Sequence, residues 1–291
     1  MCLAAGAAAS AAVFLVLYKA AQAHAPRGDV VAAMLLASAG FNSAMALVRE
    51  RGRLALGRTG RRTVLALAVG TLVGNVAVAE SLGRIEPAIT SVLMQTQVLF
   101  VALLARVALG EPITRRFVVG VAVAFLGVAV MRAPLEGSVG ISLPGVLYAL
   151  AAAAGFGAMQ VVTRKVISRI RPVPVNAARL WLATGVLLLA PGRVESLATM
   201  PPQGWALAVG AAACGPFVSR LLLMAAVRDI PASQSVLFGL ISPVLAFGLA
   251  WVLLGSVPTH RELAGGLIVL IGVAIPIHEA WRDAASPAPP T

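Results

Sequence analysis

Two arginines lie inside long apolar segments, where a charged side chain is costly and is therefore a candidate for function. Arg220 stands seven residues before the end of the segment 204–227, which places it roughly 10 Å along a helix from that end. Arg179 stands five residues into the segment 174–191 and is shallower. A guanidinium at such a place can hold a carboxylate or another anion. It can also extend to the polar end of its helix, and both roles stay open for both arginines.

Glu80 is the carboxylate of interest, because it stands near the end of the apolar segment 63–83. Partial burial raises the pKa of a carboxyl group toward the range in which it can bind and release a proton. Alternatively, Glu80 is an ordinary carboxylate facing water, or it pairs with Arg84 four residues later.

Neutral polar residues and prolines inside apolar segments are the other candidates. Polar side chains need hydrogen-bond partners away from lipid, so they either join helices or line a cavity for a polar solute. A proline removes a backbone donor and bends its helix. The resulting free carbonyls can face a ligand, or the bend can serve packing alone. These residues are Asn75, Gln95, Gln97, Gln160, Ser242, Pro216 and Pro243.

Enzyme and metal motifs are absent from the sequence. There is no His-Glu-x-x-His, no Gly-x-x-x-x-Gly-Lys-Ser/Thr and no Gly-x-Ser-x-Gly. His24, His260 and His278 are dispersed, and no cluster has the spacing of metal ligands. We therefore expect no enzyme activity, no metal and no cofactor. An intramembrane enzyme would need a catalytic pair deep in adjacent helices, which Arg220 alone does not supply.

The composition indicates which elements must position these residues. The 291 residues are 59% hydrophobic and only 12% charged, with a mean hydropathy of +0.93, whereas soluble domains are about 25% charged. Apolar runs of about 20 residues can cross a membrane, and in lipid each must be a helix. The sequence therefore predicts an all-α membrane protein with ten transmembrane helices. Their ranges are 3–22, 29–48, 63–83, 88–108, 117–133, 143–163, 174–191, 204–227, 233–254 and 263–279.

The sequence repeats itself with an offset of 145 residues, which superposes Gly110 on Gly255 and Gly127 on Gly272. The same offset superposes Asn75 on Arg220, so one position is polar in both copies. Each copy holds five predicted helices. Because five is odd, the second copy must cross the membrane in the opposite direction, an arrangement common in secondary transporters.

The distribution of positive charge also predicts inversion, since cytoplasmic loops carry excess Lys and Arg. The loop after the second helix holds six arginines between Arg49 and Arg62, and its counterpart 194–207 holds none. After the first helix of each copy the bias is reversed, with Lys165, Arg169 and Arg171 in the second copy. We therefore expect both chain ends in the cytoplasm. A small-x-small cleavage site at residues 23–25 is present, but cleavage would delete the first helix, so we expect that helix to be retained.

Two stretches carry a resemblance to a known family. "VALGEPITRRFVVGVAVAFLGVAV" (Val107–Val130) and "ASQSVLFGLISPVLAFGLAWVLLGSVPTHRELAGGLIVLIGVAI" (Ala232–Ile275) resemble the repeat ends of EamA-type members of the drug/metabolite transporter superfamily. The departures are Val98 in place of a family Pro, Ser256 in place of a turn Glu, and "AAVF" at 11–14. Arg179 matches an arginine common in the family. The resemblance implies a secondary carrier that works by alternating access, often as an exporter exchanging protons.

The resulting expectation is a ten-helix carrier in the cell membrane for a small polar or amphipathic metabolite, amino-acid-like or drug-like. We expect repeats at 1–140 and 141–280 and a disordered tail at 281–291. Its partners would be the substrate, the lipid bilayer and, as one open arrangement, a second copy in a homodimer. Nucleic acid is not expected, because the formal net charge of +12 lies mostly at helix ends. The alternative is a non-transporting scaffold or regulator with the same fold, which the missing first-helix polar cluster and Val98 keep open.

Overall fold

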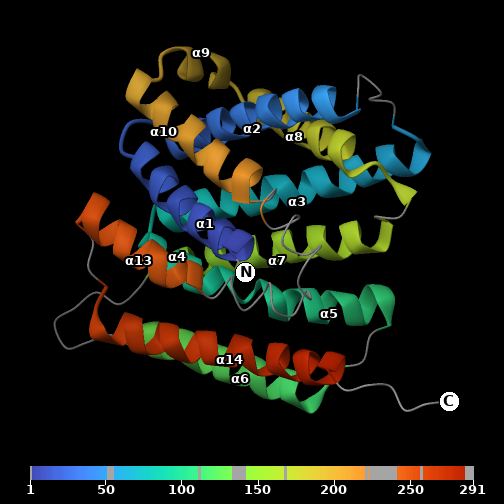
Figure 1. Ribbon diagram of the computed structural model, residues 1–291. Helices are drawn as coiled ribbons and strands as arrows, with labels where there is room; N and C mark the ends of the chain where they lie inside the picture. The colour runs from blue at the N-terminus through green and yellow to red at the C-terminus, as the bar shows by residue number, and fades with distance from the viewer. Residues whose placement is uncertain are drawn as a thin grey trace.

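The computed structural model of the chain is helical in every regular element that it describes. The residues described are 2–50, 56–110, 113–132, 142–166, 169–219, 222, 241–255 and 258–285. Figure 1 shows most of the long helices lying roughly along one common direction, as expected for a bundle that crosses a membrane. The first half contains α1 (Cys2–Ala21), α2 (Arg27–Glu50), α3 (Arg58–Leu82), α4 (Pro87–Met94), α5 (Gln97–Leu109) and α6 (Arg115–Arg132).

The second half of the chain follows a similar course. A short helix, α9, lies in the connection where the sequence predicted only a loop. The elements are α7 (Leu143–Val166), α8 (Pro172–Leu188), α9 (Arg193–Ala198), α10 (Pro202–Ala212), a π-helix (Ala213–Ser219), α13 (Ile241–Leu254) and α14 (His260–Ala285). Since α14 continues to Ala285, the helix extends into the first residues of the predicted tail.

Four segments of the described chain are long and apolar enough to cross a membrane: 27–49, 58–82, 87–108 and 143–166. Shorter apolar helices occupy 6–21, 173–188 and 242–254. All seven overlap segments predicted from the sequence. The number of spans and their inversion stay predictions.

The predicted helix 88–108 is interrupted, which corrects the expectation of one continuous helix. Gln95 and Thr96 donate backbone hydrogen bonds only three residues back, to Val92 (3.0 Å) and Leu93 (3.1 Å). The Thr96 hydroxyl also donates to the Leu93 carbonyl, at 2.6 Å. A hydroxyl that competes for a helix carbonyl in this way weakens and bends the helix, and here it accompanies the two tightened backbone bonds. The segment is therefore built from α4 and α5 in succession.

Two corresponding glycines end two corresponding helices. Gly110 follows α5 with φ 74°, and Gly255 follows α13 with φ 66°. Each donates its backbone N–H four residues back, to Arg106 and to Trp251, both at 3.1 Å. A left-handed residue that ends a helix is usually glycine, because a Cβ is strained there. Positions that the sequence offset superposed thus have the same local structure.

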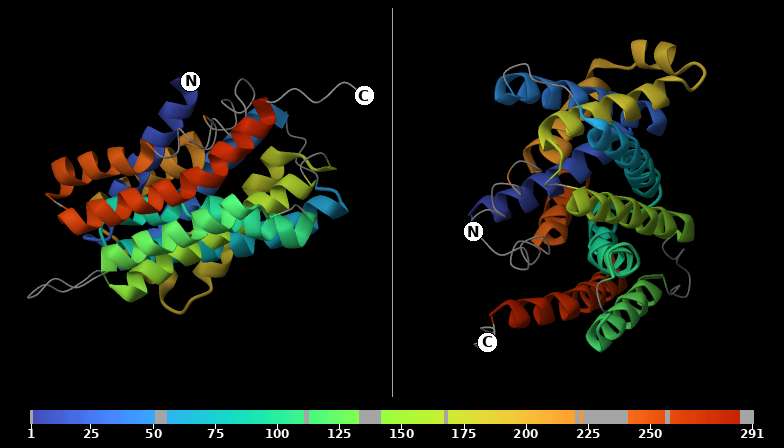
Figure 2. Two further views of the ribbon diagram at one scale, coloured as in Figure 1. Left: turned by 90° about the horizontal axis from the view of Figure 1, so that it is seen from below. Right: turned by 90° about the vertical axis from the view of Figure 1, so that its right-hand side faces the viewer.

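Helix packing relates the two halves of the chain. α2 packs on α8 and α6 packs on α14, and in both pairs the partners correspond through the offset, while α4 packs on α13, the counterpart of α5. Other contacts occur twice, once in each half of the offset. The contact of α3 with α7 corresponds to that of α10 with α1, and the contact of α5 with α7 corresponds to that of α13 with α1. Figure 2 shows α6 and α14 side by side at one edge of the bundle.

Glycines allow α6 and α14 to touch backbone to backbone. A Cβ on Gly127 would lie 2.6 Å from the backbone nitrogen of Val269, and one on Gly272 would lie 2.5 Å from that of Ala124. These two contacts are equivalent under the offset. Small residues permit such close approach in membrane helices, where packing rather than exclusion of water favours association.

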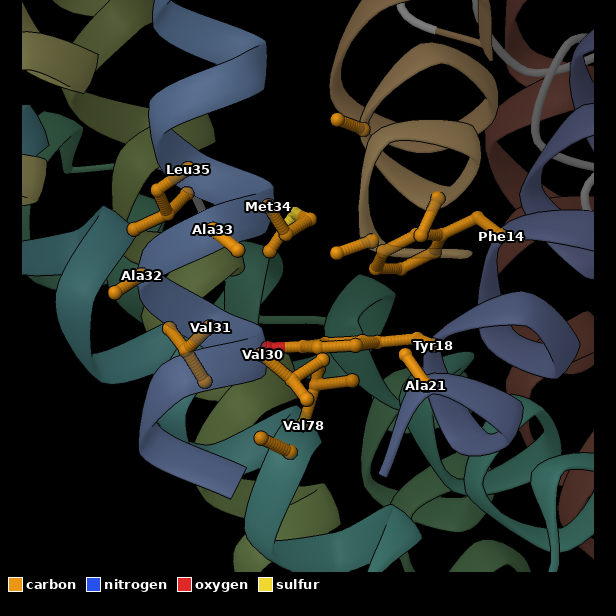
Figure 3. Packing of buried hydrophobic residues seen from close by; sticks show 14 of the residues in the cluster. Phe14, Tyr18, Ala21, Val30, Val31, Ala32, Ala33, Met34, Leu35 and Val78 are labelled. Carbon is orange, nitrogen blue, oxygen red and sulfur yellow. The ribbon is translucent and has the colours of Figure 1, made fainter. Parts of the chain in front are cut away.

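The main core joins α1, α2, α3 and α10. Tyr18 and Met34 are fully buried there, and Phe14 packs on Tyr18 with ring centroids 5.4 Å apart. Figure 3 shows Tyr18 extending from α1 toward Val30 of α2 and Val78 of α3. This core fixes the first three helices of the chain against each other and so positions the polar residues they carry.

Candidate functional site

Arg179 is buried in the middle of α8 and donates hydrogen bonds to side chains of two helices. Only 5% of the residue is exposed, although it carries a guanidinium. Its Nε donates to the Asn176 Oδ1 at 2.7 Å, and its Nη1 donates to the hydroxyl of Thr71 on α3. Because it is the eighth residue of a 17-residue helix, it is deeper than the sequence suggested. The guanidinium therefore lies inside the bundle, between α3 and α8.

The hydrogen bonds continue from Arg179 to α2. Asn176 Nδ2 donates to Asn42 Oδ1 at 2.5 Å, and Asn42 Nδ2 donates to the Ser38 carbonyl at 2.8 Å. The result is a polar network of Ser38, Asn42, Thr71, Asn176 and Arg179, which we call the central polar network. Sequence reasoning did not include Thr71 or Asn176, since hydrophilic residues on separate helices give no sign of mutual contact.

Asn75 lies one turn beyond Thr71 on α3 and is buried, with 5% exposed. The Asn75 Nδ2 donates to the backbone carbonyl of Thr71 at 2.8 Å, and the backbone carbonyl of Asn75 accepts from the Tyr18 hydroxyl at 3.3 Å. The structure therefore places two predicted residues, Asn75 and Arg179, around the same Thr71. Arg220, the proposed partner of Asn75, lies outside the described residues.

Gln97 and Gln160 contact each other, on α5 and α7. Gln97 Nε2 donates to Gln160 Oε1 at 3.1 Å, and the pair is exposed on the described structure. Gln95 is half-buried in the turn between α4 and α5, and Ser242 is buried in α13 with 5% exposed. The four residues thus occupy α5, α7, the α4–α5 turn and α13, whereas the central polar network joins α2, α3 and α8.

Glu80 forms an ion pair with two arginines. Its carboxylate accepts from Arg27 Nη1 at 2.9 Å and also from Arg84, the partner considered from the sequence. Arg27 also donates to the Gly83 carbonyl at 3.2 Å. The cluster fastens the start of α2 to the end of α3. The proton-carrier role of Glu80 stays a prediction.

A second ion pair at this end of the bundle was missed by sequence reasoning. Asp29, on the first turn of α2, is 1% exposed and accepts from Arg193 and Ser196 of α9. The partners lie 164 and 167 residues from Asp29 along the chain. The one available sign was a carboxylate at the start of an apolar segment in a chain with only 11 acidic residues.

The prolines occupy different local structures. Pro216 lies inside the π-helix that continues α10. The nearby carbonyl of Cys214 accepts from the Ser10 hydroxyl of α1 at 2.7 Å, so one carbonyl of this irregular segment serves packing between helices. Pro243 is buried in the first turn of α13 as the structure describes it. The residues before α13, where a bend would show, are not described.

Within the described residues no three His, Cys, Asp or Glu side chains are grouped so that they could hold a metal ion. A groove of about 230 Å³ between α2 and α8 is lined by Ser43 and Trp181 among apolar residues, and the Trp181 Nε1 donates to the Ser43 hydroxyl at 2.8 Å. Ser43 follows Asn42 in the chain, so the groove lies beside the central polar network.

The helical architecture and its two matched halves agree with a comparison to known families. The profile of the EamA-like transporter family matches residues 1–133 and again residues 143–277. The chain belongs to the EamA-like transporter family. The resemblance found in the sequence is thereby confirmed, and membership of this family points to a transporter rather than an enzyme.

Two further similarities add to the family match. A protein of Streptantibioticus cattleyicolor named "Probable terminal-alkyne amino-acid exporter" is 31% identical over 195 residues. These make up 64% of this EamA-like chain and 62% of the exporter. A solved crystal structure matches 96% of this chain and 97% of its own with a TM-score of 0.64. At 19% identity, that likeness shows a shared fold.

Proposed function

We propose that this transporter exports a small amino-acid-like metabolite, and that the central polar network binds the carboxylate of the cargo. The observation that carries the proposal is the buried guanidinium of Arg179, which donates to Asn176 on its own helix and to Thr71 on α3. An arginine in this setting suits a carboxylate because its planar fork of donors matches the two carboxylate oxygens. The similarity to a named amino-acid exporter supports this class of cargo.

The transport mechanism we propose is alternating access between two inverted five-helix repeats. The family profile matches the chain twice, and helices that correspond through the offset pack on each other in two pairs, α2 with α8 and α6 with α14. The equivalent glycine contacts between α6 and α14 support the same two-fold relation. In such carriers the substrate lies at the interface between repeats, near the middle of the membrane. The α2–α8 pair, which carries Asn42, Asn176 and Arg179, lies at that interface.

The remaining predicted residues have secondary roles in this proposal. Gln97 with Gln160, Gln95 and Ser242 provide polar groups on α5, α7, the α4–α5 turn and α13 for the polar remainder of the cargo. Asn75 supports Thr71, because it donates to the Thr71 carbonyl. Export in exchange for protons, with Glu80 as carrier, and a location in the plasma membrane are part of the proposal.

Transport in proteoliposomes tests the proposed site. Vesicles containing the wild type, Arg179→Met or Arg179→Lys are offered a mixed pool of amino-acid-like solutes under a pH gradient, and the lumen is analysed by mass spectrometry. We expect the wild type to accumulate a carboxylate-bearing solute. Arg179→Met should reduce uptake by at least about tenfold, since one charge-assisted bond is worth about 1.5–3 kcal/mol. Arg179→Lys should retain part of the activity.

The matched control is Arg106→Gln, which removes the same charge from an exposed position on α5. Normal uptake by a correctly folded Arg179→Met would overturn the role of Arg179. Failure of the folded wild type to move any solute, under either direction of the gradient, would favour the non-transporting scaffold.

A further inference from the structure

A groove of about 450 Å³ lies between the first turns of α3 and the last turns of α7, apart from the central polar network. Its polar side is formed by Arg58, Arg62 and the hydroxyl-bearing Thr59. Its apolar side is formed by Ala66 of α3 with Val162 and Val166 of α7. The groove is therefore cationic at one end and apolar at the other.

The two arginines are placed to hold an anion. They stand four residues apart and so lie on the same face of α3, where like charges repel each other. Both are exposed, and no carboxylate in the described residues forms an ion pair with either of them. An anion between the two guanidinium groups would remove this repulsion and could accept from both.

The start of α3 adds further donors at the same end of the groove. Thr59 has an exposed side chain, and the hydroxyl of Thr63 donates to the Thr59 carbonyl at 2.8 Å. Gly57 precedes the helix and provides no side-chain cap, so within the described residues the first backbone N–H groups of α3 have no side-chain acceptor. The positive end of the helix dipole also favours an anion here.

The apolar end of the groove continues along the outer face of α3. Leu65, Val69 and Val73 are 60%, 61% and 46% exposed and follow one another at helical spacing below Arg62. The helix is long and apolar enough to cross a membrane and begins at Arg58, so the arginines stand at the level of lipid headgroups. A free inorganic anion would use only the cationic end, whereas a phospholipid would use both ends.

We infer that this groove binds an anionic phospholipid, with its phosphate between Arg58 and Arg62 and one acyl chain along Ala66, Leu65 and Val69. The inference rests on the membrane location of the family and not on the proposed cargo. Phosphatidylglycerol is the probe we choose, because it combines a phosphodiester, a net negative charge and two acyl chains.

Native mass spectrometry of the detergent-solubilised protein, titrated with phosphatidylglycerol or phosphatidylcholine, tests the inference. We expect the wild type to bind phosphatidylglycerol in preference to phosphatidylcholine. The double variant Arg58→Gln/Arg62→Gln should bind phosphatidylglycerol about thirty-fold more weakly, since each basic residue near the headgroup contributes about a factor of five. The control Arg61→Gln/Arg106→Gln removes the same charge from exposed positions outside the groove and should retain wild-type affinity.

Equal loss in both double variants would overturn the inference, because binding would then follow net charge alone. Ala66→Phe fills the apolar end without changing charge. It should weaken the binding of phosphatidylglycerol but not the binding of glycerol phosphate, which has no acyl chain. Unchanged phosphatidylglycerol binding by Ala66→Phe would contradict the acyl-chain part. Displacement of the lipid by millimolar inorganic phosphate would show a site for free anions instead. Thermal unfolding of each variant checks that it is folded.

Discussion

At the scale of single residues, the charged side chains near the helix ends are of two kinds: those in ion pairs that join helices, and exposed cations. Asp29 and Glu80 each accept from arginines that belong to another helix or turn. Arg58 and Arg62 have no such partner in the part of the chain described. Substitutions at the two kinds of position should therefore affect different properties, stability in one case and lipid binding in the other.

The Asp29 ion pair should contribute measurably to stability. Asp29→Asn removes the charge that faces Arg193 in a site where only 1% of Asp29 is exposed. We expect it to lower the free energy of unfolding by about 1.5–3 kcal/mol, the range for a hydrogen bond to a charged group. Thermal unfolding in detergent measures the change. In a double-mutant cycle with Arg193→Met, strictly additive effects would contradict a coupled pair.

Glu80 allows a structural role to be separated from proton transport. Glu80→Gln should lower stability by only about 0.5–1 kcal/mol, because the carboxylate and both arginines are partly exposed. Glu195→Gln, an exposed carboxylate in the first turn of α9, is the matched control. If solute movement by Glu80→Gln still follows the pH gradient, Glu80 is not an obligatory proton carrier.

At the scale of elements, the contact between α6 and α14 depends on glycines that bring backbones together. Gly127→Ala should destabilise the protein by about 1–3 kcal/mol, because its Cβ would lie 2.6 Å from the Val269 nitrogen. Gly248→Ala in α13 meets nothing within 4 Å and should be neutral or stabilising, since alanine favours a helix. Thermal unfolding of the two variants compares them directly. Equal changes in stability would show that helix propensity, not close packing, determines the effect of replacing these glycines.

The turn between α4 and α5 shows how a side chain can divide one apolar segment. Composition predicted a continuous helix at 88–108, because the segment is apolar along most of its length. In the structure α4 ends at Met94. There the Thr96 hydroxyl donates to the Leu93 carbonyl, and the backbone N–H groups of Gln95 and Thr96 donate only three residues back, to Val92 and Leu93. The competition between a hydroxyl and the helix backbone is local, but its outcome depends on the packing around it.

At the scale of the whole molecule, the ends of the bundle differ in charge. Figure 1 shows that α2 and α7 end, and α3 and α8 begin, at the same end of the bundle. That end carries Arg49, Arg58, Arg61, Arg62, Arg164, Lys165, Arg169 and Arg171. An excess of basic residues marks the cytoplasmic side. The structure is therefore compatible with one orientation in the membrane, which is open to a direct test.

Labelling of single cysteines in intact cells tests this orientation. After Cys2 and Cys214 are replaced, Arg61→Cys and Arg169→Cys should react with a membrane-impermeant maleimide only after the cells are permeabilised. Exposed positions at the other end, His24→Cys and Ala198→Cys, should react in intact cells. The physical reason is that cationic loops are retained in the cytoplasm. Labelling of Arg61→Cys and Arg169→Cys on opposite sides would contradict the inverted repeats.

The sequence by itself determined the properties that depend on local composition. Apolar runs of sufficient length predicted the helices, since backbone groups in lipid must bond within the segment. The offset that superposes Gly110 on Gly255 identified two helix ends with the same left-handed geometry. The family resemblance also rested on order and spacing along the chain, and the profile match confirmed it.

Only the tertiary structure decided which polar groups meet. Arg179 and Thr71 lie 108 residues apart, and Asp29 and Arg193 lie 164 residues apart, so no periodicity connects them. The lipid groove likewise needs α3 and α7 side by side. Interhelical hydrogen bonds and ion pairs act over a few ångströms, so they exist only once packing has brought distant helices together. The apolar residues that cause this packing are too alike along the chain to specify the pairs in advance.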